Sequence, residues 1–192
     1  MSVAMESIRA QVHAPPAYAD RITELVTLAG LRPSDSADLA LLVTAQDDPS
    51  ATDRWLVDSL PHLVMCLGGE SIRLGPFVQP GVTACLRCVQ VGGAATASAA
   101  PALAPGEPLD PALLMAGVGW AVRDLATWHS GGLPLTWSSS LTLASDRQPE
   151  LQRWLRHPHC GCSWGLPDQS AGHLTDDGAD DGADDGASRR VG

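Results

Sequence analysis

Short apolar runs and segments with helical periodicity alternate along the first half of the chain. Residues 18–29 carry apolar side chains at the spacing of one helix face, and a glycine follows them. Residues 39–43 and 62–67 are continuous apolar runs, which is the pattern of strands buried on both faces. Between them, residues 52–60 have the pattern of a short helix that ends at a proline. The order strand, helix, strand over residues 39–67 therefore predicts one parallel βαβ unit.

The segments around this unit are extended or irregular. Residues 71–78 alternate apolar and polar side chains at their start, which predicts a third strand. Residues 91–109 are rich in Ala, Gly, Ser and Pro, and we expect a connecting loop there. Residues 1–16 show little periodicity and predict no particular element.

The clearest helical pattern begins at Asp110-Pro111. Aspartate is a good N-cap and proline fits the first helical position, and apolar side chains then recur on one face as far as His129. Two glycines follow, which end the helix. Residues 135–143 alternate and predict a strand. We expect residues 150–155 to form a short helical turn that places Trp154 near the last cysteines of the chain.

These elements predict an α/β fold with a partial Rossmann-like sheet. We assign residues 1–164 to one domain, because a chain of 192 residues with 44% hydrophobic side chains can bury a core of that size. Residues 165–192 contain three tandem Asp-Asp-Gly-Ala repeats. Such an acidic, glycine-rich segment cannot bury apolar surface, so we expect it to be a disordered tail.

Charge and composition exclude several classes of function. The sequence contains no lysine, so a phosphate-binding loop of the Walker type is excluded. The net charge is -10 and the chain has no basic patch, so we expect no nucleic-acid partner. No apolar run reaches the roughly eighteen residues of a membrane span, and the N-terminus lacks the apolar core of a signal peptide. We therefore expect a cytoplasmic protein that does not bind membranes.

Four of the five cysteines form two tight pairs, in Cys85-Leu86-Arg87-Cys88 and Cys160-Gly161-Cys162. Two such pairs can close a tetrahedral site of four sulfurs, which suits a structural zinc ion. Either His157 or His159 could replace one sulfur, and Arg87 could offset the negative charge of the site. The alternatives are free thiols, disulfides or a redox-active CxxC, but a redox CxxC normally opens a helix, which we do not expect here.

The other candidate residues favour structural roles. Gly117-Val118-Gly119 lacks the third glycine of a dinucleotide fingerprint and lies inside a predicted helix, so we reject a nucleotide site there. Cys66 lies in an apolar run and is expected to be a buried, inert thiol. His62 is expected to be structural or on the surface, and Asp47-Asp48 to be a solvated turn. No catalytic set of side chains is evident.

Two strings around the cysteines resemble a known family. Residues 75–88 read Gly-Pro-Phe-Val-Gln-Pro-Gly-Val-Thr-Ala-Cys-Leu-Arg-Cys, and residues 154–162 end in His-Pro-His-Cys-Gly-Cys. They are similar to the ThiF/E1-like partner proteins, also called ocin-ThiF or "C proteins", of thiazole/oxazole-modified microcin (TOMM) biosynthesis. The resemblance covers about residues 36–164.

The resemblance implies an E1/ThiF-like fold in which a structural Zn²⁺ ion is held by four ligands, Cys85, Cys88, Cys160 and Cys162. The family typically lacks the ATP site of true E1 enzymes, so no nucleotide is expected. It serves a YcaO-type cyclodehydratase, which uses ATP to form azolines in a precursor peptide. Many members carry a winged-helix leader-binding module, for which we expect no room before residue 36.

The sequence thus predicts a non-catalytic partner or scaffold protein in the biosynthesis of azole-containing ribosomal peptides (RiPPs). Its expected partners are a YcaO-type cyclodehydratase, the leader of a precursor peptide, and a second copy of the chain, since E1-like relatives often dimerise. One alternative is an E1-like enzyme that adenylates a carboxylate with ATP. The other is a zinc-stabilised interaction domain outside this pathway.

Overall fold

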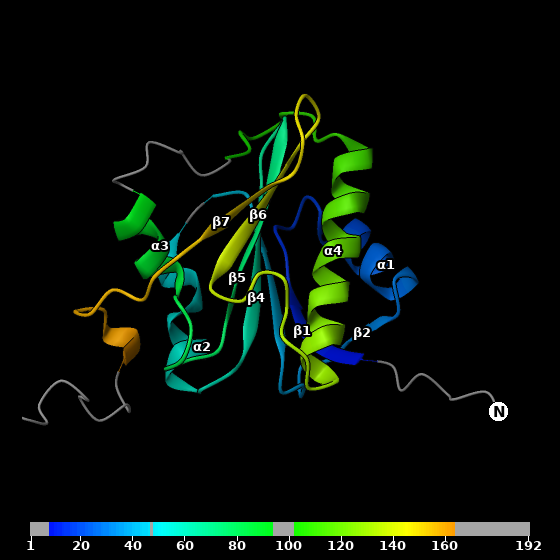
Figure 1. Cartoon of the computed structure of the whole chain (residues 1–192). Helices are drawn as coiled ribbons and strands as arrows, with labels where there is room; N and C mark the ends of the chain where they lie inside the picture. The colour runs from blue at the N-terminus through cyan, green and yellow to red at the C-terminus, as the bar shows by residue number, and fades with distance from the viewer. Residues whose placement is uncertain (1–7, 47, 94–101, 164–192) are drawn as a thin grey trace, which may run out of the picture.

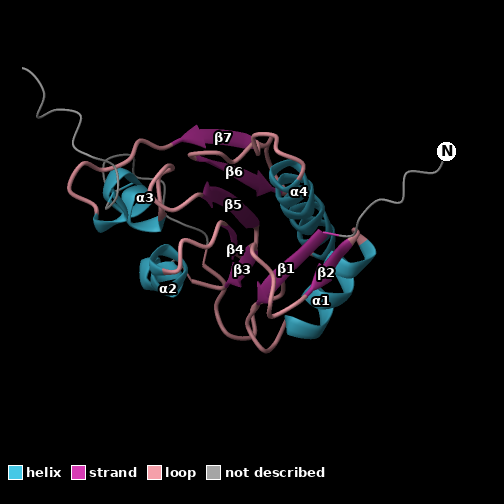
Figure 2. Cartoon of the chain, turned by 90° about the horizontal axis from the view of Figure 1, so that it is seen from below, coloured by secondary structure: helices cyan, strands magenta, loops and turns pink. Residues whose placement is uncertain are grey.

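The computed structural model describes residues 8–46, 48–93 and 102–163, which form one sheet with helices on both of its faces (Figure 1, Figure 2). The sheet has seven strands in the order β2-β1-β3-β4-β5-β6-β7. The strands are β1 (Ile8–His13), β2 (Leu31–Pro33), β3 (Ala40–Thr44), β4 (His62–Leu67), β5 (Ser71–Val78), β6 (Ser139–Ala144) and β7 (Glu150–Arg153). The helices are α1 (Ala19–Leu28), α2 (Asp53–Val57), α3 (Leu86–Gly93) and α4 (Pro111–His129), with 3-10 turns η1 (Pro49–Thr52) and η2 (Gly161–Ser163).

The first four strands are parallel. β1 pairs with both β2 and β3, and β3 pairs with β4. The predicted βαβ unit is confirmed as β3, α2 and β4, and the helix expected at residues 18–29 is α1. The sequence does not predict β1, because its polar residues at positions 9, 11 and 13 leave only Ile8 and Ala10 as buried positions. Its place inside the sheet comes from pairing on both sides and not from a strong local pattern.

The last three strands are antiparallel and include two corrections to the sequence prediction. The strand expected at residues 135–143 begins only at Ser139, because a turn precedes it. The helical turn expected at residues 150–155 is wrong, since Glu150–Arg153 is the edge strand β7. Its residues pair in register with β6, with Leu151 opposite Leu141.

The two faces of the sheet carry separate hydrophobic clusters. α1 and α4 cover the face on the right in Figure 1, and α2 and α3 lie on the left. Successive side chains of β5 point to opposite faces of the sheet. Phe77 belongs to the larger cluster under α4, and Val78 belongs to a smaller cluster that contains the cysteines. The sheet thus separates the main core from the cysteine-containing layer.

α4 is the longest helix and confirms the predicted start. The Asp110 carboxylate accepts hydrogen bonds from the backbone N–H groups of Ala112 and Leu113 at 2.8 and 3.4 Å. A Cβ atom at Gly117 would lie only 3.2 Å from the sulfur of Met65, so this glycine lets α4 approach the sheet closely. None of the helices within the described ranges is long and apolar enough to cross a membrane.

The loop expected at residues 91–109 is only partly observed. Residues 91–93 form the end of α3, residues 94–101 lie outside the described part, and residues 102–109 contain no helix or strand. The predicted tail at 165–192 also lies outside the described residues.

Candidate metal centre

The first cysteine pair is positioned by the turn that joins β5 to α3. The Thr83 hydroxyl accepts a hydrogen bond from the backbone N–H of Gln79 at 2.8 Å and donates one to the carbonyl of Phe77 at 3.1 Å. Thr83 is buried, so these bonds fix the turn from inside. Cys85 then stands directly before α3, and Cys88 lies in its first turn.

The second pair is positioned by the chain that leaves β7. The Trp154 indole donates a hydrogen bond to the Ser140 hydroxyl at 2.8 Å, and its ring lies against Gly92, where a Cβ would be 3.4 Å from it. Trp154 belongs to the same buried cluster as Cys162, and Cys160 packs against that cluster. The sequence expectation that Trp154 lies near the second pair is therefore confirmed.

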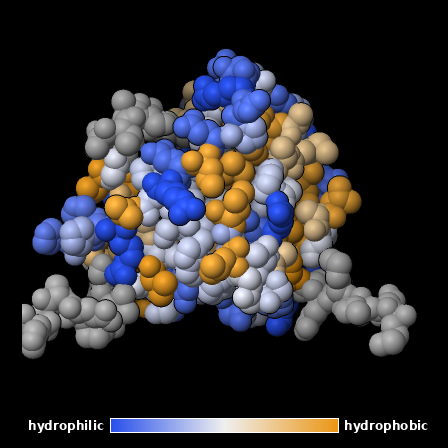
Figure 3. All heavy atoms as spheres, viewed as in Figure 1, coloured by the Kyte–Doolittle hydropathy of each residue, from blue (hydrophilic) through white to orange (hydrophobic). Residues whose placement is uncertain are grey.

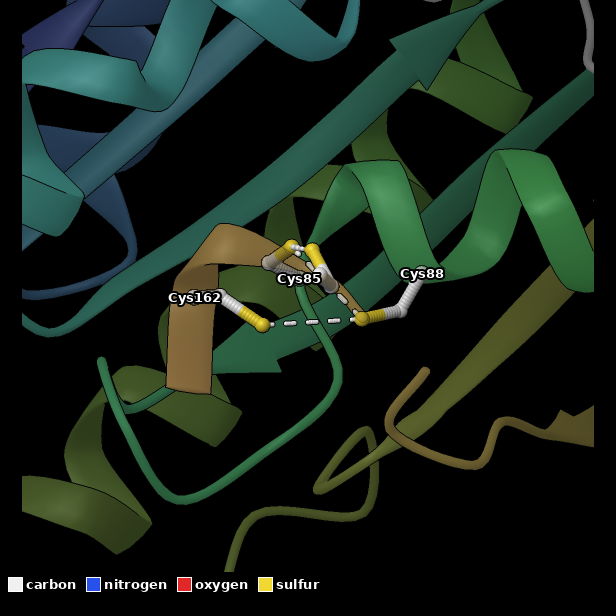
Figure 4. A group of neighbouring side chains, drawn as sticks. Cys85, Cys88 and Cys162 are labelled. Carbon is white, nitrogen blue, oxygen red and sulfur yellow. Dashed lines mark hydrogen bonds between the residues drawn. The ribbon is translucent and has the colours of Figure 1, made fainter. Parts of the chain in front are cut away.

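The structure brings the four paired cysteines together, and three of them are labelled in Figure 4. The sulfur of Cys85 lies 3.8 Å from that of Cys88 and 3.6 Å from that of Cys160. The sulfurs of Cys88 and Cys162 are 3.6 Å apart, and all four sulfurs lie within 4.8 Å of one another. A tetrahedral site with metal–sulfur bonds of about 2.3 Å has sulfur–sulfur edges of roughly 3.8 Å. The observed spacing therefore fits one tetrahedrally bound metal ion.

The same distances are too long for disulfides, whose sulfurs are about 2.0 Å apart, and all four thiols are free. One argument from the sequence needs correction, because the CxxC segment does open a helix, α3. The turn beginning at Pro80 ends just before Cys85, and the helix starts immediately afterwards. The sulfurs of the CxxC pair nevertheless face the second pair from the far end of the chain, which is the arrangement of a four-ligand site.

The protonation of the thiols also depends on this clustering. A hydrogen bond from the Cys85 thiol lowers the pKa of Cys88 to about 4, and the same bond raises the pKa of Cys85. Burial raises the pKa of Cys162 to about 11. Four thiolates so close together repel one another, so a divalent cation is needed to hold them all ionised. Soft thiolate ligands suit zinc or iron.

The side chains of the neighbouring polar residues lie near the cysteine cluster but are not part of the close group of ligand atoms. His157 donates its backbone N–H to the sulfur of Cys88 at 3.3 Å, and the close group of ligand atoms consists of four sulfurs without either imidazole. The Arg87 guanidinium forms an ion pair with Asp53 of α2, which raises the pKa of Arg87. Arg87 thus links the CxxC segment to α2.

A cavity of about 380 Å³ opens between α2 and this centre. Leu56 and Val57 form its apolar wall, and Pro80, Arg87 and Cys162 line the opposite side. The cysteine cluster therefore borders a surface depression at Cys162.

The remaining sequence candidates have structural positions. Gly117 faces the sheet inside α4, and Cys66 and His62 are fully buried in β4. Asp48 caps η1: it accepts hydrogen bonds from Ser50, which lower its pKa, and Asp47 lies outside the described residues.

The edge where an open α/β sheet usually binds ligands is occupied by the chain itself. Such ligands bind beyond the carboxyl ends of the parallel strands, where the strand order reverses. Here the backbone N–H of Leu103 donates to the carbonyl of Ala45, just after β3, at 3.0 Å. The Glu107 carboxylate lies so close to Gly69, just after β4, that a Cβ there would collide with it. Residues 102–109 therefore cross this edge.

The turn after β1 is also unlike a nucleotide-binding loop. It contains Pro15 and Pro16 and no glycine, so it offers few backbone N–H groups to a phosphate. The Tyr18 hydroxyl at its end lies 3.5 Å from the carbonyl of Glu107. The sequence does not predict this arrangement, because the loop-like composition of residues 102–109 does not indicate where the segment packs. The apolar Leu103, which is buried in the structure, is the one local sign that the segment lies against the core.

The comparisons with known proteins rest on structure alone. No family model matches the sequence, and no curated protein matches it at a significant level. The fold is similar to that of the heterocyclase TruD, with a TM-score of 0.63, 18% identity, and coverage of 81% of this chain and 27% of that one. A heterocyclase in complex with substrate and cofactor gives a TM-score of 0.64, 16% identity, and coverage of 83% and 25%.

MccB from E. coli is also similar, with a TM-score of 0.51, 15% identity, and coverage of 68% of this chain and 40% of that one. The present chain spans about a quarter of the length of the two heterocyclases. At these low identities the likeness concerns the fold, so this chain has the fold of one part of these larger proteins.

Proposed function

We propose that this chain is a non-catalytic, E1-like partner protein in the biosynthesis of azole-containing peptides. It would assist a YcaO-type cyclodehydratase, bind the precursor peptide, or do both. The observation that carries this proposal is the fold shared with one part of two heterocyclases over more than 80% of the chain. The resemblance of the two cysteine strings to ThiF/E1-like partner proteins supports it independently.

The metal in this proposal is a structural Zn²⁺ ion held by Cys85, Cys88, Cys160 and Cys162. Four cysteines fill a tetrahedral site and leave no open position for substrate, so the ion stabilises the fold. It would hold the start of α3 against the segment that follows β7. His157 would support the ion through its backbone N–H bond to Cys88.

Elemental analysis with two matched variants tests the metal assignment. We expect about one zinc per chain in the wild type and in Cys66→Ser, because Cys66 lies outside the cluster. Cys85→Ser should lose the metal and have a lower melting temperature. Equal metal contents in the two variants, or iron in place of zinc, would contradict the assignment.

A non-catalytic role is supported by the carboxyl edge of the sheet. Residues 102–109 cross the place where a nucleotide would lie, and the turn after β1 has two prolines and no glycine. The lack of lysine removes the side chain that most often binds phosphates in loops of this kind. These features favour a scaffold that lets another subunit carry out the ATP-dependent step.

The test is reconstitution with the cyclodehydratase and the precursor peptide. We expect the zinc-loaded chain to be retained by an immobilised cyclase or precursor, and heterocycle formation to fall when the chain is left out. Folded, zinc-loaded protein that binds neither component and leaves the rate of heterocycle formation unchanged would overturn the proposal.

The runner-up is an E1-like enzyme that adenylates a carboxylate. The observation in its favour is the similarity in fold to MccB, a protein whose structure in complex with ATP gives a TM-score of 0.50 with this chain. An adenylating enzyme exchanges pyrophosphate with ATP in the presence of its carboxylate substrate. We expect no such exchange, and exchange that requires this chain and the precursor peptide would favour the enzyme.

A further inference from the structure

We propose that Ser138, which lies outside both cysteine pairs, is a positioning residue of the metal centre and sets the distance between the two pairs. Its hydroxyl accepts a hydrogen bond from the backbone N–H of Ala84 at 3.2 Å, and its carbonyl accepts one from the backbone N–H of Trp154 at 2.8 Å. Ala84 directly precedes the first pair, and Trp154 begins the segment that leads to the second pair. The inference rests on the metal assignment within the proposed function and not on the azole pathway.

The side chains around Ser138 divide between the two layers of the fold. Trp137 packs against the main core under α4. The Ser138 hydroxyl instead contacts Ala84, and the Ser140 hydroxyl accepts the indole N–H of Trp154 at 2.8 Å. Ala84 and Trp154 both belong to the cysteine-containing cluster. Ser138 is therefore the position at which the chain, as it enters β6, bonds to both cysteine-bearing segments.

The backbone of Ser138 indicates that its side chain has a role beyond the turn itself. The backbone N–H of Ser139 donates to the carbonyl of Thr136 at 3.0 Å and closes a tight turn, in which Ser138 is the third residue. The φ angle of Ser138 is 47°, in the left-handed region that glycine and asparagine adopt most easily. The turn alone would favour glycine, whereas the hydroxyl bond to Ala84 gives a reason for serine at this position.

The same turn is fixed to the main core from its other side. The buried Asp124 carboxylate accepts hydrogen bonds from the hydroxyl and the backbone N–H of Thr136, at 2.6 and 2.9 Å. The backbone N–H of Phe77, in β5, donates to the Thr136 carbonyl at 2.9 Å. A turn held by both α4 and β5 is a rigid support, so the segments that bond to Ser138 are placed relative to the main core.

Apolar contacts alone do not fix the position of the two cysteine-bearing segments. Ser138 is only partly buried, and the face of the molecule that carries β7 shows hydrophilic and hydrophobic atoms side by side (Figure 3). Apolar contacts are not directional, whereas a hydrogen bond requires a defined distance and angle between its two partners. We therefore expect the bonds of Ser138 to form together with the metal site and to contribute to metal affinity.

Titration of the metal-free full chain with Co²⁺ tests this role in two matched variants. Co²⁺ binds sites of this kind more weakly than Zn²⁺, so its dissociation constant can be measured directly from the visible absorption of the cobalt–thiolate site. Ser138→Gly removes the hydroxyl at a position where glycine fits the backbone. Ser59→Gly is the control, because Ser59 is the other non-glycine residue with positive φ in the described part of the chain, at 54°.

We expect Ser138→Gly to bind Co²⁺ about tenfold more weakly than the wild type, which corresponds to the loss of one hydrogen bond. Ser59→Gly should bind it as the wild type does. Urea unfolding of the metal-free chains separates a positioning role from a purely structural one. A bond that forms only with the metal site changes the metal affinity and leaves the unfolding midpoint of metal-free Ser138→Gly equal to that of Ser59→Gly.

A lower midpoint of metal-free Ser138→Gly with an unchanged Co²⁺ affinity would overturn the proposal, as would an equal loss of affinity in both variants. A wild-type chain that binds neither Co²⁺ nor Zn²⁺ would overturn the metal assignment and this inference together. If the wild type binds the metal and Ser138→Gly binds it equally well, the metal assignment stands and the role of Ser138 is wrong.

Discussion

The buried His62 is a single residue that makes the stability of the folded state depend on pH. It lies fully buried at the start of β4, with its ring against Trp55 at a centroid distance of 5.2 Å. Its Nδ1 is 2.8 Å from the carbonyl of Leu60, and its Nε2 has no hydrogen-bond partner among the described residues. Burial therefore lowers the pKa of His62 to about 4.

This environment predicts a loss of stability in mild acid. The folded pKa of about 4 lies below the ordinary value of 6.5, so the unfolded chain takes up a proton first as pH falls. The stabilisation that the neutral His62 gives to the folded state is fully present above pH 6.5, and it is lost as the pH falls towards 4. Between pH 7 and pH 5 the free energy of unfolding should drop by about 2 kcal/mol from this group.

Urea unfolding at the two pH values measures this drop. His62→Gln should reduce the difference between pH 7 and pH 5 by about 2 kcal/mol. The control is His129→Gln, since His129 is exposed at the end of α4. A wild-type difference that survives unchanged in His62→Gln would show that other groups cause the acid sensitivity.

At the scale of elements, the sequence predicts best where the local pattern is long or repeated. α4 is predicted correctly because a cap, a proline and several apolar turns all indicate it. The helical turn predicted at residues 150–155 is wrong, because Glu150–Arg153 is the strand β7; Leu151 and Trp154 are three residues apart, a spacing that fits a helix face as well as two faces of a sheet. In the structure Leu151 points to one face of the sheet and Trp154 to the other. The pairing of residues 150–153 with β6 therefore makes this segment a strand and not a helical turn.

The cysteine site follows the same rule. The spacing within each pair is local, so the amino-acid sequence alone identifies the four candidate ligands. What brings the pairs together is not local: the Trp154 indole donates to the Ser140 hydroxyl, and the backbone N–H of Ala84, next to Cys85, donates to the Ser138 hydroxyl at 3.2 Å. The same holds for residues 102–109, which are held over the sheet edge by contacts with distant residues, among them the Leu103 N–H bond to Ala45 and the packing of Glu107 against Gly69.

Asp124 joins two elements and gives a prediction at this scale. It is 3% exposed on α4 and accepts hydrogen bonds from the backbone N–H of Leu135 at 3.1 Å and of Thr136 at 2.9 Å. The Thr136 hydroxyl donates a third bond at 2.6 Å. These bonds hold the turn that precedes β6, and the ring of Trp137, the residue after Thr136, stacks on that of Trp128 of α4 with centroids 5.5 Å apart.

Asp124→Asn should destabilise the protein by about 2–3 kcal/mol, because in either orientation of the amide its NH2 group would face a backbone N–H, of Leu135 or of Thr136, with a donor of its own. Chemical unfolding measures the change, and near-UV circular dichroism should show a weaker signal from the two tryptophans. Asp20→Asn on the exposed side of α1 serves as the matched control. A cost no larger than that of the control would mean that the turn forms without this carboxylate.

For the whole molecule, the division into two hydrophobic clusters decides what the metal ion proposed for the cysteine cluster would stabilise. The cluster under α1 and α4 extends over β1 to β6 and needs no metal to exclude water. The opposite cluster contains three of the four clustered cysteines and few large side chains besides Val78, Val89 and Trp154. Apolar burial alone supports the second layer weakly, so its order should depend on the ion.

Removal of the metal should therefore unfold one layer before the other. After chelation, hydrogen exchange should become faster in the amides of α3 and of residues 154–163, while those of α4 remain protected. The variant Cys66→Ser, which keeps all four ligands, should respond to the chelator as the wild type does. Cys85→Ser should show fast exchange in α3 without any chelator. If the amides of α4 and α3 instead exchange together, the sheet and both layers form one cooperative unit, and the metal stabilises the whole fold and not only the layer that binds it.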